Sequence, residues 1–328
     1  HCRARKPRLF VMPMSLAKKL GIALVVILII LAAAFWVLTR GDTASVPWEE
    51  VVGTDPTLEE PNAEGIPTVA IAEPVGWADD EVPIAAEGLA VTRFADGLEH
   101  PRTLQALPNG DILVSLTRAP AKEDDGGIMA WIAGLLMDRA GAGGESPNQV
   151  VLLRDADGDG RAEVRQVLLD GLDSPSGLAW HDGTLYVANH DEVLAYPYEL
   201  GAAAVSGEPR KVTDLAAGGG HWMRNLAINE EGTKLYVAVG SDTNIADKGM
   251  EAEEGRALIW EVDLESGRRR IFGGGLRNAN GLDFNPWSGE LWTTVNERDM
   301  LGSDLVPDYL TNVPVGAQYG WPWVYWKD

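Results

Sequence analysis

The chain has 328 residues, of which 45% are hydrophobic and 23% charged, so it can bury the core of one large domain. Its formal net charge is −22 at pH 7, but residues 1–40 contain seven basic and no acidic side chains. The remainder therefore carries a net charge of about −29, which disfavours nucleic acid and anionic lipid head groups as partners. Such acidity suits a neutral or cationic substrate, bound calcium, or solubility alone.

An apolar segment at residues 20–38 is the first element in the chain. Its nineteen residues carry no charge, which is long enough for one helix to cross a bilayer. Residues 1–19 are basic and contain no acid, so the positive-inside rule predicts a cytoplasmic N-terminus and an extracytoplasmic main domain. A cleaved secretory signal is the alternative, although the run is long for one and residues 39–42 lack a small-residue cleavage site. We predict a single-pass inner-membrane protein.

The next segment, residues 39–83, is acidic and rich in proline, with little periodic hydrophobicity. This composition is typical of an extended linker. We expect it to hold the following domain, residues 84–328, away from the membrane.

A weak repeat follows, in which a glycine turn precedes an apolar strand, a polar turn and a second strand rich in β-branched and aromatic residues. Four copies occur, near residues 97–114, 171–187, 219–237 and 275–292. Their spacing fits four-stranded blades with loop insertions, so the fold class is all-β, a six-bladed β-propeller of which about four blades are recognisable. A β-sandwich would need shorter and more even turns.

One insertion, at residues 119–148, contains an apolar run at residues 127–137 that is too short to cross a membrane. We predict a helix packed on the propeller face. Contact with the bilayer surface is the alternative.

An acidic turn at residues 155–160, DADGDG, matches the start of a calcium-binding loop. Asp155, Asp157 and Asp159 alternate as oxygen ligands would, but Gln166 stands at the twelfth position, where an EF-hand needs a bidentate glutamate. The EF-hand interpretation is therefore excluded. A surface calcium site and a plain hairpin turn both remain open.

A histidine lies in a glycine-rich turn directly before a predicted strand. His221 follows three glycines and is close to Arg224, and Asn244 ends the next hairpin. Propeller loops of this kind meet at the central channel, where a histidine can act as a general base. A hydrogen-bonded structural histidine is the alternative.

The corresponding turn of the next repeat contains Arg277 and Asn278. An arginine can bind a carboxylate in bidentate fashion, and an asparagine can donate to a carbonyl or bind a cation. Alternatively, Arg277 pairs with an acid such as Glu297, which is itself a candidate metal ligand. Tyr319 and Trp321 could stack on a sugar or a flat cofactor, or belong to the core.

In combination, the segments GLRNANGL, VNERDMLGSDLVPDY and YGWP resemble the PQQ-dependent sugar dehydrogenases, and most closely their membrane-bound sorbosone dehydrogenase branch. The resemblance implies a six-bladed propeller whose remaining blades and cofactor contacts lie beyond Asp328. Thr243 departs from the pattern, because glucose dehydrogenases of this family have an arginine there.

The same resemblance implies a reaction. His221 would take the proton from the substrate hydroxyl while hydride moves from the same carbon to PQQ, calcium would polarise the quinone, and the substrate would be a sugar or an aldehyde. Arg224, Asn244, Arg277 and Asn278 would then lie on the cofactor side, and Tyr319 and Trp321 would border the substrate. Electrons would pass to a membrane quinone or a periplasmic carrier. A calcium-dependent lactonase and a binding propeller without chemistry are the competing hypotheses.

Overall fold

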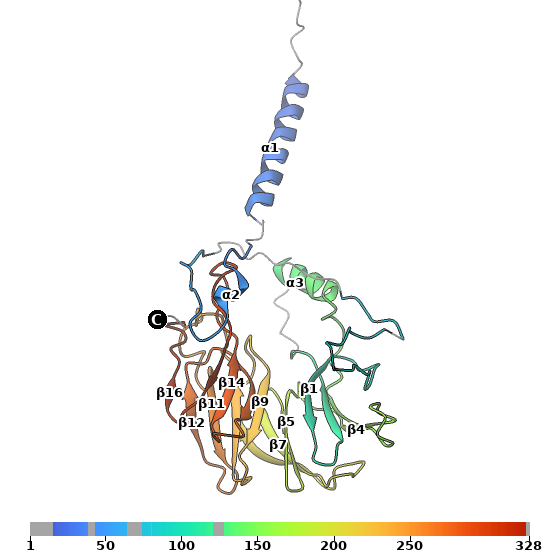
Figure 1. The fold of residues 1–328 in the computed structure, drawn as a ribbon. Helices are drawn as coiled ribbons and strands as arrows, with labels where there is room; N and C mark the ends of the chain where they lie inside the picture. The colour runs from blue at the N-terminus through green and yellow to red at the C-terminus, as the bar shows by residue number, and fades with distance from the viewer. Residues whose placement is uncertain (1–15, 39–42, 64–73, 80, 121–127, 326–328) are drawn as a thin grey trace, which may run out of the picture.

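The computed structural model describes residues 16–38, 43–63, 74–79, 81–120 and 128–325 (Figure 1). Most of the predicted cytoplasmic segment, at residues 1–15, lies outside the described residues, as do residues 39–42, 64–73 and 80 of the predicted linker.

Helix α1 (Leu16–Leu38) has 23 residues, which at 1.5 Å per residue gives a length of about 35 Å. The side chains that the structure describes in this helix are exposed, and its composition from Lys18 to Val37 is apolar enough to cross a membrane. The helix contains the predicted segment at residues 20–38, and by length and composition it can be either a membrane span or a signal sequence.

The rest of the described chain is a β-propeller with four blades, as predicted, arranged around a channel. Blade 1 consists of β1 (Pro101–Ala106), β2 (Ile112–Leu116), β3 (Gln149–Arg154) and β4 (Val164–Leu169). Blade 2 consists of β5 (Gly177–His181), β6 (Thr184–Ala188), β7 (Glu192–Pro197) and β8 (Arg210–Asp214). Blade 3 consists of β9 (Arg224–Ile228), β10 (Lys234–Val239), β11 (Leu258–Asp263) and β12 (Arg269–Gly274). Blade 4 contains β13 (Ala279–Phe284), β14 (Leu291–Val295) and β15 (Tyr309–Asn312).

Within each blade the strands are antiparallel and follow chain order, which the turn residues explain. Between β5 and β6, for example, Asp182 and Gly183 have φ of 39° and 75°. Two such residues make the tight hairpin turn whose twist matches that of the strands. The short strand β16 (Ala317–Gln318) pairs in parallel with β12, so the chain returns from blade 4 to blade 3.

The core lies between consecutive blades, because each sheet buries its apolar face against the next. Leu113 and Leu152 of blade 1 form one cluster with Leu185 and Val187 of blade 2. Similar clusters join blades 2 and 3, and blades 3 and 4. Successive side chains of a strand point to opposite faces of the sheet, so a blade between two others contributes apolar side chains to both of its interfaces.

The innermost strands, β1, β5, β9 and β13, line a central cavity of about 400 Å³. Close approach of blades 2 and 3 depends on Gly177 at the start of β5. A Cβ there would lie 2.7 Å from the Arg224 carbonyl oxygen and 2.9 Å from Leu226 Cγ. Any larger side chain would therefore push the two inner strands apart.

The N-terminal segment returns to the propeller after α1. Short helix α2 (Trp48–Val51) lies at the end of the propeller from which α1 rises (Figure 1). Just before it, the Ser45 amide and hydroxyl donate to the Asp304 carboxylate at 2.8 and 2.9 Å, and farther on the Asn62 amide donates to the Leu301 carbonyl at 3.0 Å. The described part of the predicted linker at residues 43–63 is thus bound to the loop after blade 4's second strand.

The insertion between β2 and β3 forms helix α3 (Ile128–Arg139), in agreement with the predicted helix. The helix was expected to pack on the propeller face, but the side chains that the structure describes in it are largely exposed. The side chains of Trp131, Leu135 and Met137 are 69%, 56% and 52% exposed. The described part of the chain therefore leaves these side chains open rather than packed on the propeller face.

We predict that Gly177→Ala lowers the free energy of unfolding by about 1–3 kcal/mol, because the new methyl group overpacks the junction of blades 2 and 3. Denaturant unfolding of the full chain measures this value. Gly207→Ala is the matched control, because a Cβ at Gly207 makes only an ordinary contact of 3.7 Å with Pro197. Equal stability of the two variants would contradict the account of the junction.

Candidate functional site

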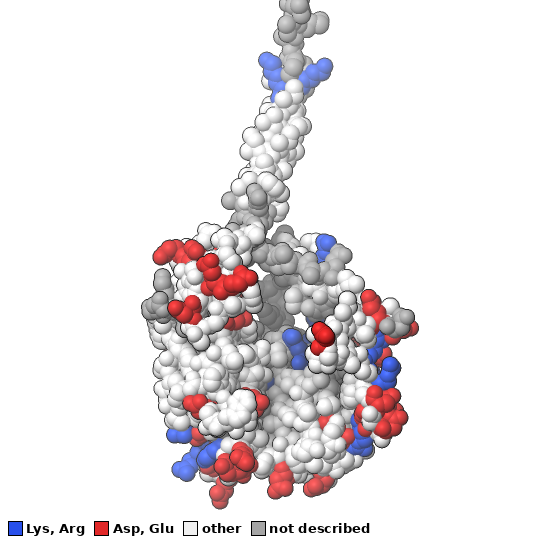
Figure 2. Space-filling view, viewed as in Figure 1, with Lys and Arg blue, Asp and Glu red and all other residues white. Residues whose placement is uncertain are grey.

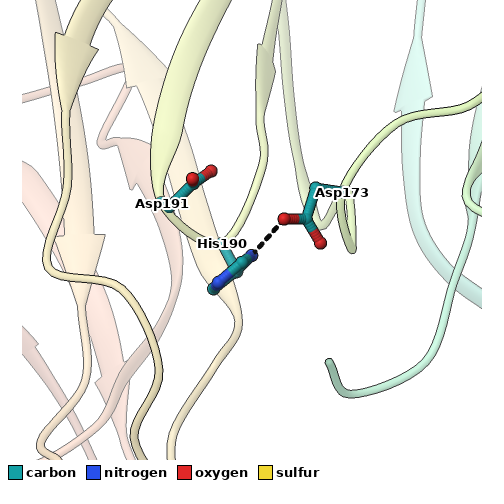
Figure 3. Close-up of side chains that lie close together, drawn as sticks. All are labelled: Asp173, His190 and Asp191. Carbon is teal, nitrogen blue, oxygen red and sulfur yellow. Dashed lines mark ion pairs between the residues drawn. The ribbon is translucent and has the colours of Figure 1, made fainter. Parts of the chain in front are cut away.

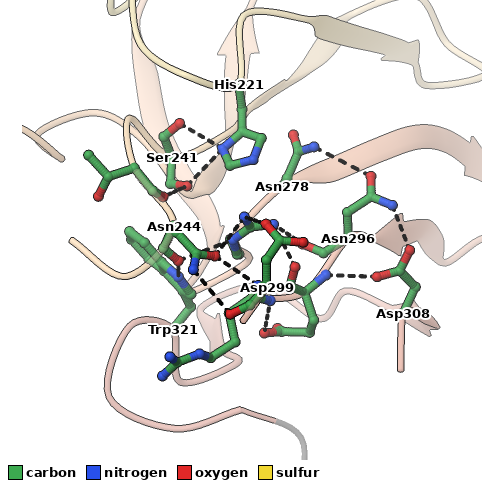
Figure 4. A network of polar contacts seen from close by, with 12 residues as sticks. His221, Ser241, Asn244, Asn278, Asn296, Asp299, Asp308 and Trp321 are labelled. Carbon is green, nitrogen blue, oxygen red and sulfur yellow. Dashed lines mark hydrogen bonds and ion pairs between the residues drawn. The ribbon is translucent and has the colours of Figure 1, made fainter. Parts of the chain in front are cut away.

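The predicted polar residues gather in one network of contacts (Figure 4). The loop after β14, which contributes to this network, is bound through Asp304 to Ser45, just before α2 at the end of the propeller from which α1 rises (Figure 1). Successive strands run in opposite directions, so the segments before each inner strand and after each second strand meet at one end. His221 precedes β9, Asn244 follows β10, Arg277 precedes β13, and Glu297 follows β14. The structure thus brings segments from blades 3 and 4 into one site.

His221 is held through one ring nitrogen. Its Nδ1 lies 2.9 Å from both the carbonyl oxygen and the Oγ of Ser241. Ser241 Oγ donates its own proton to the Thr243 carbonyl at 2.6 Å, and a carbonyl oxygen can only accept. Nδ1 must therefore carry the proton, which leaves Nε2 with a free lone pair in the neutral imidazole.

The surroundings of His221 favour this neutral form. Burial lowers the pKa of the imidazole below its usual value, and the positive charge of Arg277 lowers it further. Asn278 flanks the ring from the next blade. A Cβ on Gly240 would lie 2.5 Å from both Asn278 Oδ1 and His221 Cβ, so only glycine permits these two residues to approach.

Arg277 is 4% exposed and joins three segments of the site. Its Nε donates to the Asn244 carbonyl at 3.1 Å, and its Nη2 donates to Asn244 Oδ1 and to Asp299 Oδ2, both at 2.8 Å. Its Nη1 donates to the Glu297 carbonyl at 2.6 Å. The acid that pairs with Arg277 is therefore Asp299 rather than Glu297, and its side chain is 73% exposed.

Arg224 lies beneath the site and is fully buried. Its guanidinium donates to the carbonyls of His190 at 3.1 Å, Ala216 at 2.8 Å, His221 at 2.9 Å and Met223 at 3.0 Å. Burial lowers its pKa to about 9, so the group stays protonated at neutral pH. The structure therefore places Arg224 as a support for the loop that carries His221.

The loop after β14 is fixed by Asp308, whose carboxylate accepts from the Glu297 amide at 2.9 Å and from Asn296 Nδ2 at 2.7 Å. Glu297 is 4% exposed, and burial raises the pKa of its carboxyl group. Its Oε2 accepts from the Arg298 amide at 3.1 Å. Glu297 thus offers a buried carboxyl group beside Arg277.

The two predicted aromatic residues lie in different surroundings. Trp321 is 4% exposed, and its indole donates to the Asn244 carbonyl at 3.0 Å. Tyr319 stacks on Tyr309 with ring centroids 6.4 Å apart, donates its hydroxyl to the Asn312 carbonyl, and borders a cavity of about 930 Å³ that α2 also lines. Trp321 therefore holds the loop that carries Asn244, and Tyr319 lies at the edge of the neighbouring cavity.

The acidic turn lies far from this site, at the start of β4 in blade 1. Carboxylate oxygens of Asp155, Asp157, Asp159 and Glu163 lie within 4.8 Å of one another. Backbone amides already bind several of them, including the Gly158 and Gly160 amides on Asp155 at 2.6 and 2.8 Å. Glu163 is a fourth member that the motif alone did not indicate.

Asp173, His190 and Asp191 of blade 2 form a second group of possible metal ligands that the sequence did not indicate (Figure 3). Asp173 and His190 take the positions in blade 2 that His221 and Ser241 take in blade 3. His190 Nδ1 lies 3.1 Å from Asp173 Oδ2, and the Asp191 carboxylate completes a set of possible metal ligands. Asp173 precedes the inner strand as His221 does, and His190 follows the second strand as Ser241 does. Alignment of the blade repeats residue by residue would have found the pair.

The sequence model of the TrAA12-like family matches residues 147–313. The solved structures to which the chain is similar include the calcium structure of family AA12 of the carbohydrate-active enzymes from Trichoderma reesei and the holo form of the pyranose dehydrogenase PQQ domain from Coprinopsis cinerea. The first has a TM-score of 0.59 at 20% identity, covering 77% of this chain and 62% of that one. The second has a TM-score of 0.57 at 18% identity, covering 74% and 59%. At this identity they establish the propeller fold.

Among curated proteins, the aldose sugar dehydrogenase YliI of Escherichia coli (strain K12) is 28% identical over 153 residues, which is 39% of this chain and 38% of the relative. The chain thus matches about two fifths of the length of its curated relatives.

We predict that His221 titrates below 6.5, the usual value for histidine, and carries its proton on Nδ1 when neutral. The buried, neutral form is favoured, so the proton is lost at a lower pH than in an unfolded chain. Long-range proton–nitrogen NMR spectra measure both properties, with His221→Gln to assign the signal. A neutral ring protonated on Nε2, or a titration above pH 6.5, would contradict this geometry.

Proposed function

Because the chain belongs to the TrAA12-like family, we propose that it bears the active site of a sugar oxidoreductase. The reaction we propose is oxidation of a sugar, or of a sugar-derived aldehyde or alcohol, with PQQ as the hydride acceptor and His221 as the general base. The names of the similar proteins support this class of substrate and cofactor. Sorbosone, in keeping with the resemblance found in the sequence, is one candidate substrate.

The observation that carries the proposal is the state of His221. Its Nδ1 proton is committed to Ser241, its pKa is lowered by burial, and Nε2 retains a lone pair at neutral pH. A general base needs this combination of fixed orientation and neutral charge. The substrate hydroxyl would bind at Nε2 and lose its proton there.

The arginine of the site fits an anionic cofactor. PQQ supplies a quinone carbonyl that accepts hydride, together with carboxylate groups that need cationic partners. Arg277 Nη2 already holds the exposed carboxylate of Asp299 at 2.8 Å. A cofactor carboxylate offers the same pair of oxygen atoms and would replace Asp299 there. Asn244 and Asn278 would contribute amide donors beside it, and Arg224 would act by holding the His221 loop.

Calcium is the second proposed cofactor. The oxygen atoms of Asp155, Asp157, Asp159 and Glu163 are the ligands that calcium prefers. Glu297 offers a buried carboxyl group at the principal site. The similar calcium structure from family AA12 supports the choice of ion.

For the substrate and the membrane we propose the following arrangement. Tyr319 would border the sugar from the side of the large cavity, with Trp321 fixing the loop behind it. Residues 1–19 would be cytoplasmic, and residues 20–38 would span the inner membrane. Residues 39–83 would connect this span to the periplasmic domain formed by residues 84–328. Electrons would leave to a membrane quinone or a periplasmic carrier.

The test is sugar-dependent dye reduction by the full chain loaded with PQQ and calcium. We expect activity with an aldose or aldehyde, and a loss of about 100- to 10,000-fold in His221→Gln because the general base is gone. PQQ binding should persist in this variant, since the cofactor contacts are retained.

His181→Gln serves as the control, because His181 lies at the end of β5 remote from the site. Failure of a broad sugar and aldehyde panel, with PQQ bound, would contradict the proposal. Lactone hydrolysis without PQQ would favour the competing hydrolase.

A further inference from the structure

Helix α3 has an apolar surface that no other part of the described chain covers. Trp131 and Leu135 are four residues apart, so they lie on the same side of the helix, and they are 69% and 56% exposed. Ile132 and Leu136 are each 37% exposed, and Met137 is 52% exposed. Contiguous exposed apolar side chains of this kind mark interaction surfaces.

The composition of α3 differs from that of a helix on a soluble protein. From Ile128 to Met137 it contains no charged side chain, so it has no polar stripe to present to water. Its first charged residue is Asp138, in the last turn. A helix that is apolar on all sides belongs either in a protein core or in lipid.

The place of α3 in the fold decides between these. It lies across the end of the propeller from which α1 rises (Figure 1). The turn after α3 also lies beside the segment that leads from α1 to the propeller, because a Cβ on Gly141 would be 2.9 Å from Pro74 Cγ. If α1 crosses a bilayer, the bilayer surface is therefore on the side of α3.

Length rules out a second span. Twelve residues of helix measure about 18 Å, whereas a hydrocarbon core is about 30 Å thick. A short apolar helix with a tryptophan can instead lie in the plane of the membrane interface, where the indole ring is favoured.

We propose that α3 is a second membrane contact, lying in the interface of the bilayer that α1 crosses, and that it holds the His221 end of the propeller toward the membrane. The inference rests on the proposed role of α1 as an anchor. Two attachments to the bilayer would fix the orientation of the domain more firmly than α1 alone. A lipid-soluble electron acceptor would then lie on the side of the site.

The attachment would depend on apolar contact rather than on charge. Acidic side chains gather on the same end of the molecule over α2 (Figure 2), whose first turn contains Glu49 and Glu50. These carboxylates would repel anionic head groups, so insertion of α3 should be at least as complete in neutral lipid as in anionic lipid, and salt should not weaken it.

The experiment places single nitroxide labels on the full chain in phosphatidylcholine nanodiscs. In a Cys2→Ser background, the variants are Leu135→Cys to test α3, Ile27→Cys to test the anchor, and Glu265→Cys as the control in the turn between β11 and β12. Collisions with oxygen report lipid, and collisions with a water-soluble nickel complex report solvent. We expect the ratio of oxygen to nickel collisions at residues 27 and 135 to exceed that at residue 265 several-fold.

Three results would overturn the proposal. A label at residue 135 as open to nickel as the one at residue 265, with residue 27 in lipid, would leave the anchor but remove α3 from the membrane. A label at residue 135 shielded from both reagents would mean that protein covers α3. A label at residue 27 in water would remove the anchor and the proposal with it, while leaving the chemistry at His221 to its own test.

Discussion

The site depends on two buried guanidinium groups that satisfy the carbonyl oxygens of irregular loops. Arg224 opens β9, and Arg277 lies just before β13, so they take nearly equivalent places in consecutive blades. Buried carbonyls without a donor would cost about 1–3 kcal/mol each, and loops at the end of a channel cannot satisfy them as strands do. Arg224 thereby connects blade 3 to the His190 loop of blade 2, and Arg277 connects blade 4 to the Asn244 loop of blade 3. The polar residues of these loops keep fixed positions as a result.

These supports explain the chemistry available at His221. Arg224 holds the His221 carbonyl, Ser241 fixes the ring, and the charge of Arg277 helps to keep the ring neutral. The same Arg277 holds the Asp299 carboxylate, which is largely exposed and for which an anionic cofactor would compete under the proposed function. An imidazole and a guanidinium group thus lie together, which is the arrangement that the proposed oxidation of a hydroxyl group would use.

The sequence predicted the blades because glycine turns and alternating strands are local signals, and both are present in Asp182-Gly183 and the strands beside them. The resemblance to the PQQ-dependent sugar dehydrogenases implied that His221, Asn244, Arg277 and Asn278 would converge, and the repeat put the turns of His221 and Arg277 at corresponding points of consecutive blades. The sequence could not predict that Arg224 binds backbone carbonyls. Every residue has a carbonyl group, so no residue type marks the ones that an arginine will bind. The sequence could not predict the exposure of Trp131 either, because that depends on where the insertion lies relative to the blades. The roles assigned to the site residues stay predictions.

The central claim is that this end of the propeller binds PQQ through Arg277. Titration of PQQ with calcium into the full chain, followed by calorimetry and by the absorbance of the quinone, tests it directly. The account predicts saturable binding with one cofactor per chain, weakened in a folded Arg277→Met variant and unchanged in Lys234→Met, whose partner Asp263 lies in blade 3 away from the site. Absence of saturable binding, or equal affinity of Arg277→Met and the unaltered chain, would contradict it.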